Sequence, residues 1–396
     1  MPNSTALPVA SCLPLARALA MTPSVSGDEE AAVRLVADAM RDAGFADVQI
    51  DEAGNAIGIT GSGGGPRLLI DGHIDSIPLH SADRWTQNPF GGEVVGGRLY
   101  GLGICDQKAS IAAAIAGVAA AAAAGDLGAP VAVVASVCEE AMEGQGLRSA
   151  IDRFAPDVVI TSEPNDTRLG IGQRGRAKVE VTVTGRACHA GHAARGVNAA
   201  EALAALIGVV RAMPQPSHPD LGVRDVTCID IASWPYPSVS TVPGQAMARF
   251  DCRFLPEETP ESLTAMIQRC AAEAWASWPE HPEIEIGLVR AQFASWTGAQ
   301  FDAPEFCHAW WTDAEGALVR TASEALIEAA LDPTPTHYSF CTNGSLSAGL
   351  LGIPTLGFGV GLEHIAHQVD EYVTLDSLAA GERGYRSLAC HLTASS

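Results

Sequence analysis

The chain has 396 residues, 47% of them hydrophobic, and its 46 Asp and Glu outnumber its 24 Lys and Arg to give a formal net charge of −22. This length exceeds what one hydrophobic core usually serves, so two domains are expected. A chain this acidic is repelled by phosphate backbones and anionic lipids, which argues against nucleic acid or a membrane as a partner.

The cysteines and the N-terminus favour a cytoplasmic protein. The ten cysteines include no Cys-x-x-Cys pair, and reduced thiols are the expected state. The first residues lack the basic and apolar regions of a signal peptide. The longest apolar run, residues 109–124, is shorter than the roughly 20 residues that a membrane span needs. Because it is mostly alanine, we expect it to be a buried helix.

The first part of the chain alternates helical patterns with apolar runs that are typical of strands. Residues 28–43 have helical spacing, and the apolar run 131–137 is typical of a strand covered on both faces. This alternation predicts an α/β catalytic domain in which helices flank a central, mostly parallel sheet. The other strands expected here are 46–50, 56–60, 68–70, a hairpin over 94–100, and 158–161.

The pattern changes near Arg176. Residues 178–184, KVEVTVT, alternate polar and apolar side chains as a strand with one wet face does. The elements expected from there run strand, helix, strand, strand, helix, strand, which predicts a smaller inserted α+β domain of ferredoxin-like topology. These elements are 178–184, 198–213, 226–232, 246–254, 260–278 and 284–289.

After about residue 292 the chain becomes loop-rich, then helical at 315–330, with a last apolar strand at 354–358. The predicted domains are therefore 1–176 with 293–396, which would bind metal, and 177–292 between them.

Side chains that commonly bind metals follow apolar strands or turns at five places. Beyond the carboxyl ends of the strands of an α/β sheet, such groups converge in space. A lone carboxylate or histidine at a strand end is usually solvated or packed, but five together favour a metal site. The segments are DGHIDS (71–76), GLGICDQK (101–108), VCEEAMEGQG (137–146), TSEP (161–164) and GLEHIAHQVDE (361–371).

In this motif order the chain resembles the zinc-dependent family of aminoacylases, acetylornithine deacetylases, succinyl-diaminopimelate desuccinylases and related dipeptidases. The resemblance covers nearly the whole chain and is greatest to a poorly characterised group of hydrolases. It also rests on W-x-x-x-P-F at 85–90, GQRGRAKVEV at 172–181 and TNG at 342–344.

The resemblance implies a site for two divalent ions. His73 and Glu163 would hold one ion, Glu140 and His367 the other, and Asp106 would bridge them. Two imidazoles with three carboxylates suit zinc, with manganese and cobalt as alternatives.

Roles beside the ligands are implied as well. Asp75 would accept the second ring N–H of His73 and fix its tautomer. Glu139 would be the general base that takes a proton from a metal-activated water and returns it to the leaving nitrogen. His364 competes with His367 as a ligand, but the family pattern A-H-x-x-x-E fits residues 366–371 and favours His367.

The inserted domain and the TNG motif supply further candidates. His189, with His192 as the alternative, would reach across a homodimer formed through residues 177–292 and contact the oxyanion. Arg253 would bind a substrate carboxylate, an exposed strand arginine being the alternative reading. Asn343 and Gly344 would contact the substrate near the metals.

The implied reaction is hydrolysis of the amide C–N bond of an N-acyl amino acid or a small dipeptide with a free carboxylate. The alternatives are a metal-dependent aminohydrolase (deaminase) acting on a small amino-carboxylate, a non-catalytic ligand-binding relative, and a thiol hydrolase. Three departures from the family pattern, Leu102, Cys105 and Ser240, leave the metal ligands intact but argue against the classical deacetylase and desuccinylase specificities.

Overall fold

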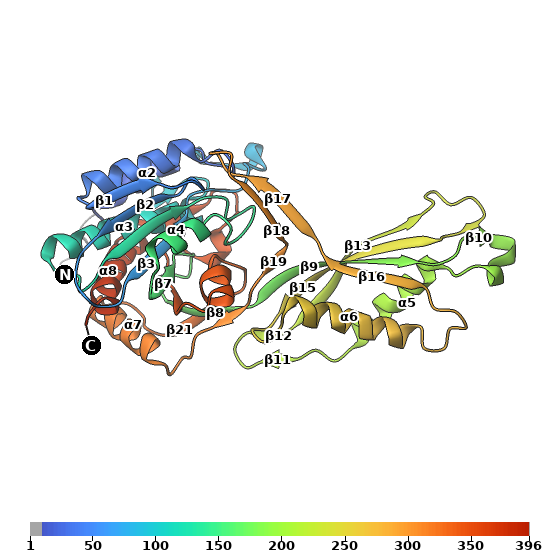
Figure 1. Cartoon of the computed structure of the whole chain (residues 1–396). Helices are drawn as coiled ribbons and strands as arrows, with labels where there is room; N and C mark the ends of the chain where they lie inside the picture. The colour runs from blue at the N-terminus through green and yellow to red at the C-terminus, as the bar shows by residue number, and fades with distance from the viewer. Residues whose placement is uncertain (1–9, 396) are drawn as a thin grey trace, which may run out of the picture. The chain divides into compact units, whose positions relative to one another are not determined.

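The computed structural model describes residues 10–395, which form two compact units (Figure 1). The first unit comprises the chain up to Gln173, Gln292–Phe301 and the chain from Trp310 onward. The second comprises Arg174–Ala291 and Asp302–Ala309. The predicted boundaries differ from these units at residues 174–176 and 302–309, which belong to the second unit, and at residue 292, which belongs to the first. Residues 302–309 belong to the second unit because strand β19 (Phe306–Cys307) pairs with β9 (Gly175–Thr184).

The first unit is built on a nine-stranded mixed sheet, with the strand order β1-β2-β6-β3-β7-β22-β8-β20 and β21 beside β8. The four strands from β6 to β22 are parallel, and β21 pairs parallel with β8, whereas the pairs β1–β2, β2–β6, β22–β8 and β8–β20 are antiparallel. The sheet is therefore parallel at its centre and mixed as a whole, where a mostly parallel sheet was expected. The strands are β1 (Asp47–Ile50), β2 (Ala56–Thr60), β3 (Leu68–His73), β6 (Val131–Ser136), β7 (Val158–Thr161), β8 (Leu169–Gln173), β20 (Trp310–Trp311), β21 (Pro335–Tyr338) and β22 (Thr355–Gly357). A separate small sheet contains β4 (Val94–Val95), β5 (Arg98–Tyr100) and β23 (Tyr372–Thr374).

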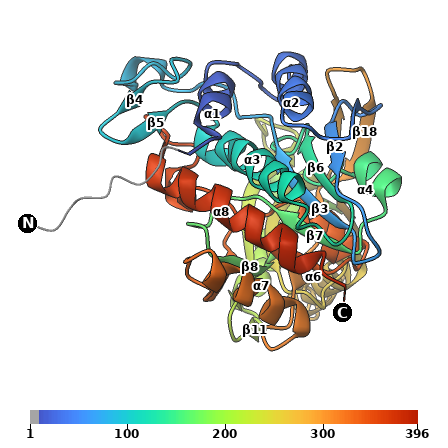
Figure 2. The same cartoon turned by 90° about the vertical axis from the view of Figure 1, so that its left-hand side faces the viewer.

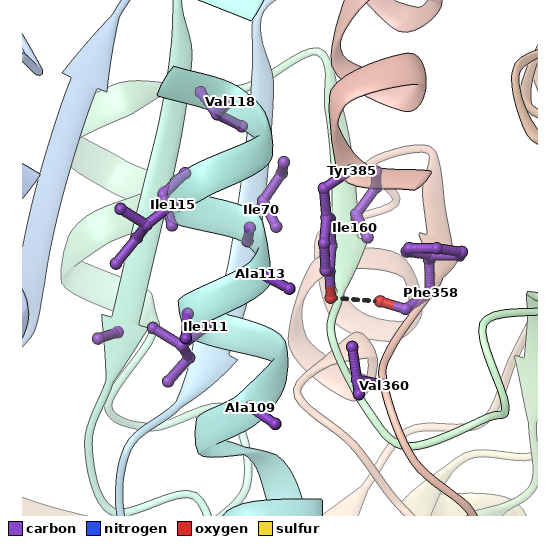
Figure 3. Close-up of a cluster of buried hydrophobic side chains, with 14 of the residues drawn as sticks. Ile70, Ala109, Ile111, Ala113, Ile115, Val118, Ile160, Phe358, Val360 and Tyr385 are labelled. Atoms are coloured by element: carbon purple, nitrogen blue, oxygen red, sulfur yellow. Dashed lines mark hydrogen bonds between the residues drawn. The ribbon is translucent and has the colours of Figure 1, made fainter. Parts of the chain in front are cut away.

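Helices cover both faces of this sheet, because the central strands are apolar on both sides (Figure 2). On one face Ile70 of β3 and Ile160 of β7 lie in the larger core with α3 and α8 (Figure 3). On the other face Leu69 and Val159 pack with α4. The helices are α1 (Leu13–Ala20), α2 (Glu30–Asp42), α3 (Ala109–Ala124), α4 (Arg148–Phe154), α7 (Ala317–Glu328) and α8 (Leu375–Leu392).

Helix α3 is the alanine-rich run that the sequence predicts to be a buried helix. Among the described residues one stretch, Ile104–Ala124, is long and apolar enough to cross a membrane by length and composition, but 67% of it is buried in the molecule. It is packed as a core helix, and α8 lies against it, where the Tyr385 hydroxyl donates a hydrogen bond of 2.6 Å to the main-chain oxygen of Phe358.

The second unit has a sheet with the order β13-β15-β9-β16, all of whose neighbours are antiparallel, and β19 also pairs with β9. Apolar side chains of β9 and β15 pack with helices α5 and α6, while the residues between them are partly exposed. The main elements are α5 (Ala199–Ala212), β13 (Asp225–Trp234), β15 (Gln245–Phe254), α6 (Pro260–Ala274) and β16 (Glu283–Leu288). Short strands are β10 (Cys188–His189), β11 (Ser217–His218), β12 (Gly222–Val223) and β14 (Thr241–Val242). The hairpin of β17 (Arg290–Ala294) and β18 (Gln300–Pro304) has residues in both units.

Candidate metal centre

The carboxyl ends of four parallel strands meet at one edge of the first sheet. His73 is the last residue of β3, and it lies opposite Ser136, the last residue of β6. Glu139 and Glu140 follow β6, and Glu163 follows β7, so the chain itself brings these groups to the same edge. His367 comes from the loop after β22.

Asp106 lies between two histidines and presents a different oxygen to each. Its Oδ1 is 3.0 Å from His73 Nε2, and its Oδ2 is 3.3 Å from His367 Nε2. His367 Nε2 is also 2.8 Å from Glu140 Oε1. This is the arrangement that a carboxylate bridging two cations requires.

Two overlapping groups of side chains could each hold a metal ion. One consists of His73, Asp106 and Glu140, and the other of His73, Glu139 and Glu163; within each group the ligand atoms lie within 4.8 Å of one another. With His367 beside Glu140, the structure brings together all five ligands that the family resemblance implies, and it places Glu139 among them.

The site is rich in buried carboxylates and short of positive charge. Burial raises the pKa of Glu139 and Glu163 well above the usual carboxyl range. Hydrogen bonds to Asp106 and Glu140 raise the pKa of His367 to about 10. Burial opposes the charged form of His73, but its hydrogen bonds to Asp106 and Asp75 raise its pKa well above the usual value.

The donor set therefore fits divalent cations. In their absence protons on the two imidazoles are the available countercharge between the carboxylates. The buried Oε1 of Glu139 has no hydrogen-bond partner among the described residues. Imidazole nitrogens and carboxylate oxygens are the donors that zinc, manganese and cobalt accept.

The family model described as Peptidase family M20/M25/M40 matches residues 69–391. The chain belongs to this family. YgeY of Escherichia coli K12 is 30% identical over 371 residues, covering 90% of this chain and 88% of that protein. The succinyl-diaminopimelate desuccinylase of Methylobacterium radiotolerans is 29% identical over 397 residues, covering 93% of each.

Solved structures of the family share the fold. The YXEP protein of Bacillus subtilis, described as a dinuclear metal binding peptidase from the M20 family, superimposes with a TM-score of 0.72 at 15% identity, over 96% of this chain and 97% of that one. Membership makes the present chain a metal-dependent hydrolase of peptide or acyl-amino acid amide bonds.

The contacts of Asp75 differ from the expectation that its carboxylate accepts the second ring N–H of His73. The Nδ1 of His73 is 3.0 Å from the main-chain oxygen of Asp75 and 3.5 Å from its carboxylate. The carboxylate instead accepts hydrogen bonds from the main-chain N–H of Glu139 and Glu140 and from the hydroxyl of Ser26, at 3.1, 3.0 and 2.7 Å. Asp75 thus connects His73 to the loop that carries Glu139 and Glu140.

Glu371 holds the loop that carries Asp106, a role that the sequence motifs did not predict. Its buried carboxylate accepts hydrogen bonds from the main-chain N–H of Gly103, Cys105 and Asp106, at 2.9, 2.7 and 3.1 Å. Burial raises its pKa to about 7. The signal was its place at the end of the A-H-x-x-x-E pattern, but the pattern alone does not say what the acid contacts.

The loop that carries His367 is held by hydrogen bonds to another loop, residues 80–87. His80 Nε2 is 3.1 Å from the main-chain oxygen of His367, and Asp370 accepts hydrogen bonds from the main-chain N–H of Thr86 and Gln87. Thr86 and Gln87 lie within the W-x-x-x-P-F motif at 85–90, whereas His80 precedes it in a segment that no motif marked. Of the two competing histidines, His367 is the one within ion-pair distance of Asp106 and Glu140 among the described residues.

Asn343 and Gly344 are buried structural neighbours of the site. Asn343 donates hydrogen bonds to Asp71 and Ser136, at 2.9 and 3.2 Å, and accepts one of 2.6 Å from Gly144 N–H. Both amide hydrogens are thereby used within the protein. A Cβ on Gly344 would lie 2.5 Å from the Trp310 indole nitrogen, so close packing alone accounts for this glycine.

His189 and Arg253 belong to the second unit. His189 is exposed at the end of β10, where its Nδ1 accepts a hydrogen bond of 3.0 Å from Gly191 N–H, and the ring of His192 lies 6.1 Å away. Arg253 donates to Asp251 on the same strand at 2.8 Å.

Proposed function

We propose that this chain is a two-metal hydrolase that cleaves the amide C–N bond of an N-acyl amino acid or a small dipeptide with a free carboxylate. The observation that carries the proposal is the carboxylate of Asp106, whose two oxygens face His73 and His367 separately. Burying a charged aspartate costs free energy, so a cluster of acidic residues without a function is not expected to contain one in this position.

In this proposal His73 and Glu163 hold one ion, Glu140 and His367 the other, and Asp106 both. Bound zinc, or manganese or cobalt, would polarise the scissile carbonyl and lower the pKa of water. The metal identity follows from the donor set and is part of the proposal.

The catalytic role of Glu139 is supported by its position. Its Oε2 lies 3.9 Å from His73 Nε2, and its Oε1 is buried without a partner among the described residues. Burial raises the pKa of Glu139, which suits a group that takes a proton from the attacking water and gives it to the leaving nitrogen. Asp75 orients His73 and Glu139 together.

The second unit would complete the site from the dimer. His189 would donate to the oxyanion and Arg253 would bind the substrate carboxylate, for which it must exchange its bond to Asp251. The homodimer is supported by β13, an edge strand with Ile231 and Trp234 exposed at 67% and 44%. A cytoplasmic location is supported by the ten free cysteines.

The test is metal content together with hydrolysis of a panel of N-acyl amino acids and dipeptides. We expect about two ions per chain and cleavage of an amide. Absence of metal under every loading condition would overturn the proposal. Two bound ions with ammonia release from amino-carboxylates, and no amide cleavage, would identify the aminohydrolase alternative, and binding without turnover would identify the ligand-binding one.

A further inference from the structure

The loop that carries Glu139 and Glu140 is held by a row of buried acceptors. Four consecutive main-chain N–H groups, from Val137 to Glu140, each donate to a side chain from elsewhere in the first unit, at 3.0 to 3.1 Å. Asp75 accepts the last two, and Asn55 and Glu29 accept the first two. Among the described residues, no hydrogen bond or ion pair joins Asn55 or Glu29 to a side chain proposed as a metal ligand, and neither residue belongs to a sequence motif.

Asn55 bonds to both ends of this loop. Its Oδ1 accepts from Val137 N–H at 3.0 Å, and its Nδ2 donates to the main-chain oxygen of Gly146 at 2.8 Å. One amide side chain therefore fixes the distance between the residue that precedes the catalytic segment and the residue that follows it. The ends are packed so closely that a Cβ on Gly146 would lie 1.9 Å from the oxygen of Val137.

Asn55 is itself fixed by a turn that contains another buried acid. Asp51 accepts hydrogen bonds from the main-chain and side-chain nitrogens of Asn55, both at 2.8 Å, and from the Ser149 hydroxyl at 2.7 Å. The indole of Trp296 donates to the oxygen of Gly54 at 3.1 Å. The acceptor is thus part of a rigid frame, as a group that positions another must be.

Glu29 acts on the next residue along the loop. Cys138 has a φ of +61°, a conformation that residues other than glycine rarely adopt. Its N–H donates to the buried carboxylate of Glu29 at 3.1 Å, and its thiol lies 3.4 Å from the same oxygen. This contact holds the backbone in the turn that directs the next side chain, Glu139, into the site.

We propose that Asn55 and Glu29 are positioning residues that hold Glu139 in its catalytic orientation. The inference rests on the proposed function. The tip of Glu139 has one oxygen without a partner and the other 3.9 Å from His73, so the orientation of its carboxylate depends on the backbone behind it. Displacement of a catalytic group by about 1 Å can reduce a rate ~100-fold, which makes such a frame consequential.

The experiment compares Asn55→Ala, Glu29→Ala and Glu29→Gln in the metal-loaded full chain. We expect the two alanine variants to lower kcat by about 10- to 100-fold with little change in KM or metal content. Glu29→Gln keeps an oxygen acceptor for Cys138 N–H and should stay near the wild-type kcat. Hydrogen–deuterium exchange of the amides of residues 137–140 should speed up in the alanine variants alone.

Asn198→Ala is the matched control. Asn198 caps α5 in the second unit by accepting from Ala200 and Glu201 N–H, so its loss should lower the melting temperature without changing kcat or the exchange of residues 137–140.

If Asn55→Ala does not fold, the comparison of Glu29→Ala with Glu29→Gln decides. The inference is wrong if both Glu29 variants retain kcat, if both lose it equally, or if exchange at 137–140 does not change. Failure of the wild-type enzyme to cleave any amide would refute the proposed function instead. The exchange data would still test whether Asn55 and Glu29 hold the backbone of residues 137–140.

Discussion

Each carboxylate oxygen of Asp106 lies close to a nitrogen of a different histidine, and these contacts favour the protonated form of both imidazoles. Both histidines have raised pKa values in the metal-free protein, that of His367 to about 10. A histidine with a raised pKa contributes stability that is complete below the unfolded pKa of about 6.5 and is lost as the pH rises through its folded value. At a pH between the unfolded and the folded pKa values, the histidines of the metal-free protein are protonated. They must lose these protons before they can bind a metal ion.

We therefore predict that metal loading at pH 7 releases protons, one from each of the two imidazoles. The measurement is titration of the metal-free protein with zinc in a weak buffer containing a pH indicator. His367→Ala should release fewer protons and bind less metal, whereas His364→Ala should behave as wild type. Zinc uptake without proton release would contradict the raised pKa values of the two histidines.

Glu139→Gln should lower kcat by about 10²- to 10⁴-fold, because the amide is isosteric but cannot accept the proton. Metal content should remain that of wild type, since Glu139 is not among the five proposed ligands. Glu143→Gln, a nearby charge change on the same loop, should keep most of the activity. Equal losses in the two variants would point to general electrostatics in place of a base.

The ligand candidates were predictable because each one follows a recognisable strand or turn in a motif. The contacts of Glu29, Asn55 and Glu371 were not, because they join segments far apart in the chain: Glu29 with Cys138, and Glu371 with Gly103. A motif or a helical pattern can include such a residue, as it does for Glu371 and Glu29, without indicating what its side chain contacts. Asn343 was predicted to contact the substrate, but its amide hydrogens bond within the protein.

At the scale of elements, helices α3 and α8 pack against each other with their backbones close together. A Cβ on Gly117 of α3 would lie 2.5 Å from the main-chain oxygen of Glu382 in α8. Likewise a Cβ on Gly381 or Gly384 of α8 would lie 2.3 Å from Val360 or 2.1 Å from Phe358. Glycine weakens an isolated helix, but at these positions it allows the helices to pack closely against their neighbours.

Gly117→Ala should therefore destabilise the protein by about 1–3 kcal/mol, because backbone atoms must move apart. The measurement is chemical denaturation of the metal-free chain. Gly208→Ala is the matched change in α5, where nothing lies within 4 Å of the new Cβ, and it should stabilise by about 0.4–1 kcal/mol. The same sign for both variants would contradict the steric explanation.

The length and the glycine content of each helix account for which helices the sequence revealed. The alanine run predicted α3 at its observed bounds, and α2, α5, α6 and α7 lie within the ranges expected for them. Helices α1, α4 and α8 were missed: α1 and α4 have eight and seven residues, and α8 contains two glycines. The return of residues 302–309 was missed because its two-residue pairing with β9 is too short to give a pattern.

For the whole molecule, the proposed dimer depends on one edge. Ile231→Lys on β13 places a charge where an apolar contact is expected, so we predict a shift from dimer to monomer in sedimentation, with the melting behaviour of each chain little changed. Ile327→Lys, an equally exposed apolar position in α7 at 63%, should leave the assembly intact. A wild-type chain that sediments as a monomer at micromolar concentration would rule the dimer out.

The strand order of the first sheet has a consequence for biosynthesis. β22, residues 355–357, lies between β7 and β8, both of which are complete before residue 174. A nascent chain must therefore carry an open sheet edge at β7 while about half of its length is still untranslated, and the second unit emerges from the ribosome during that interval. Contacts of such sequence separation form slowly. The metal centre can be assembled only near the end of translation, when His367 arrives, so a truncated product is an inactive chain with exposed strand edges, which cells must clear or shield.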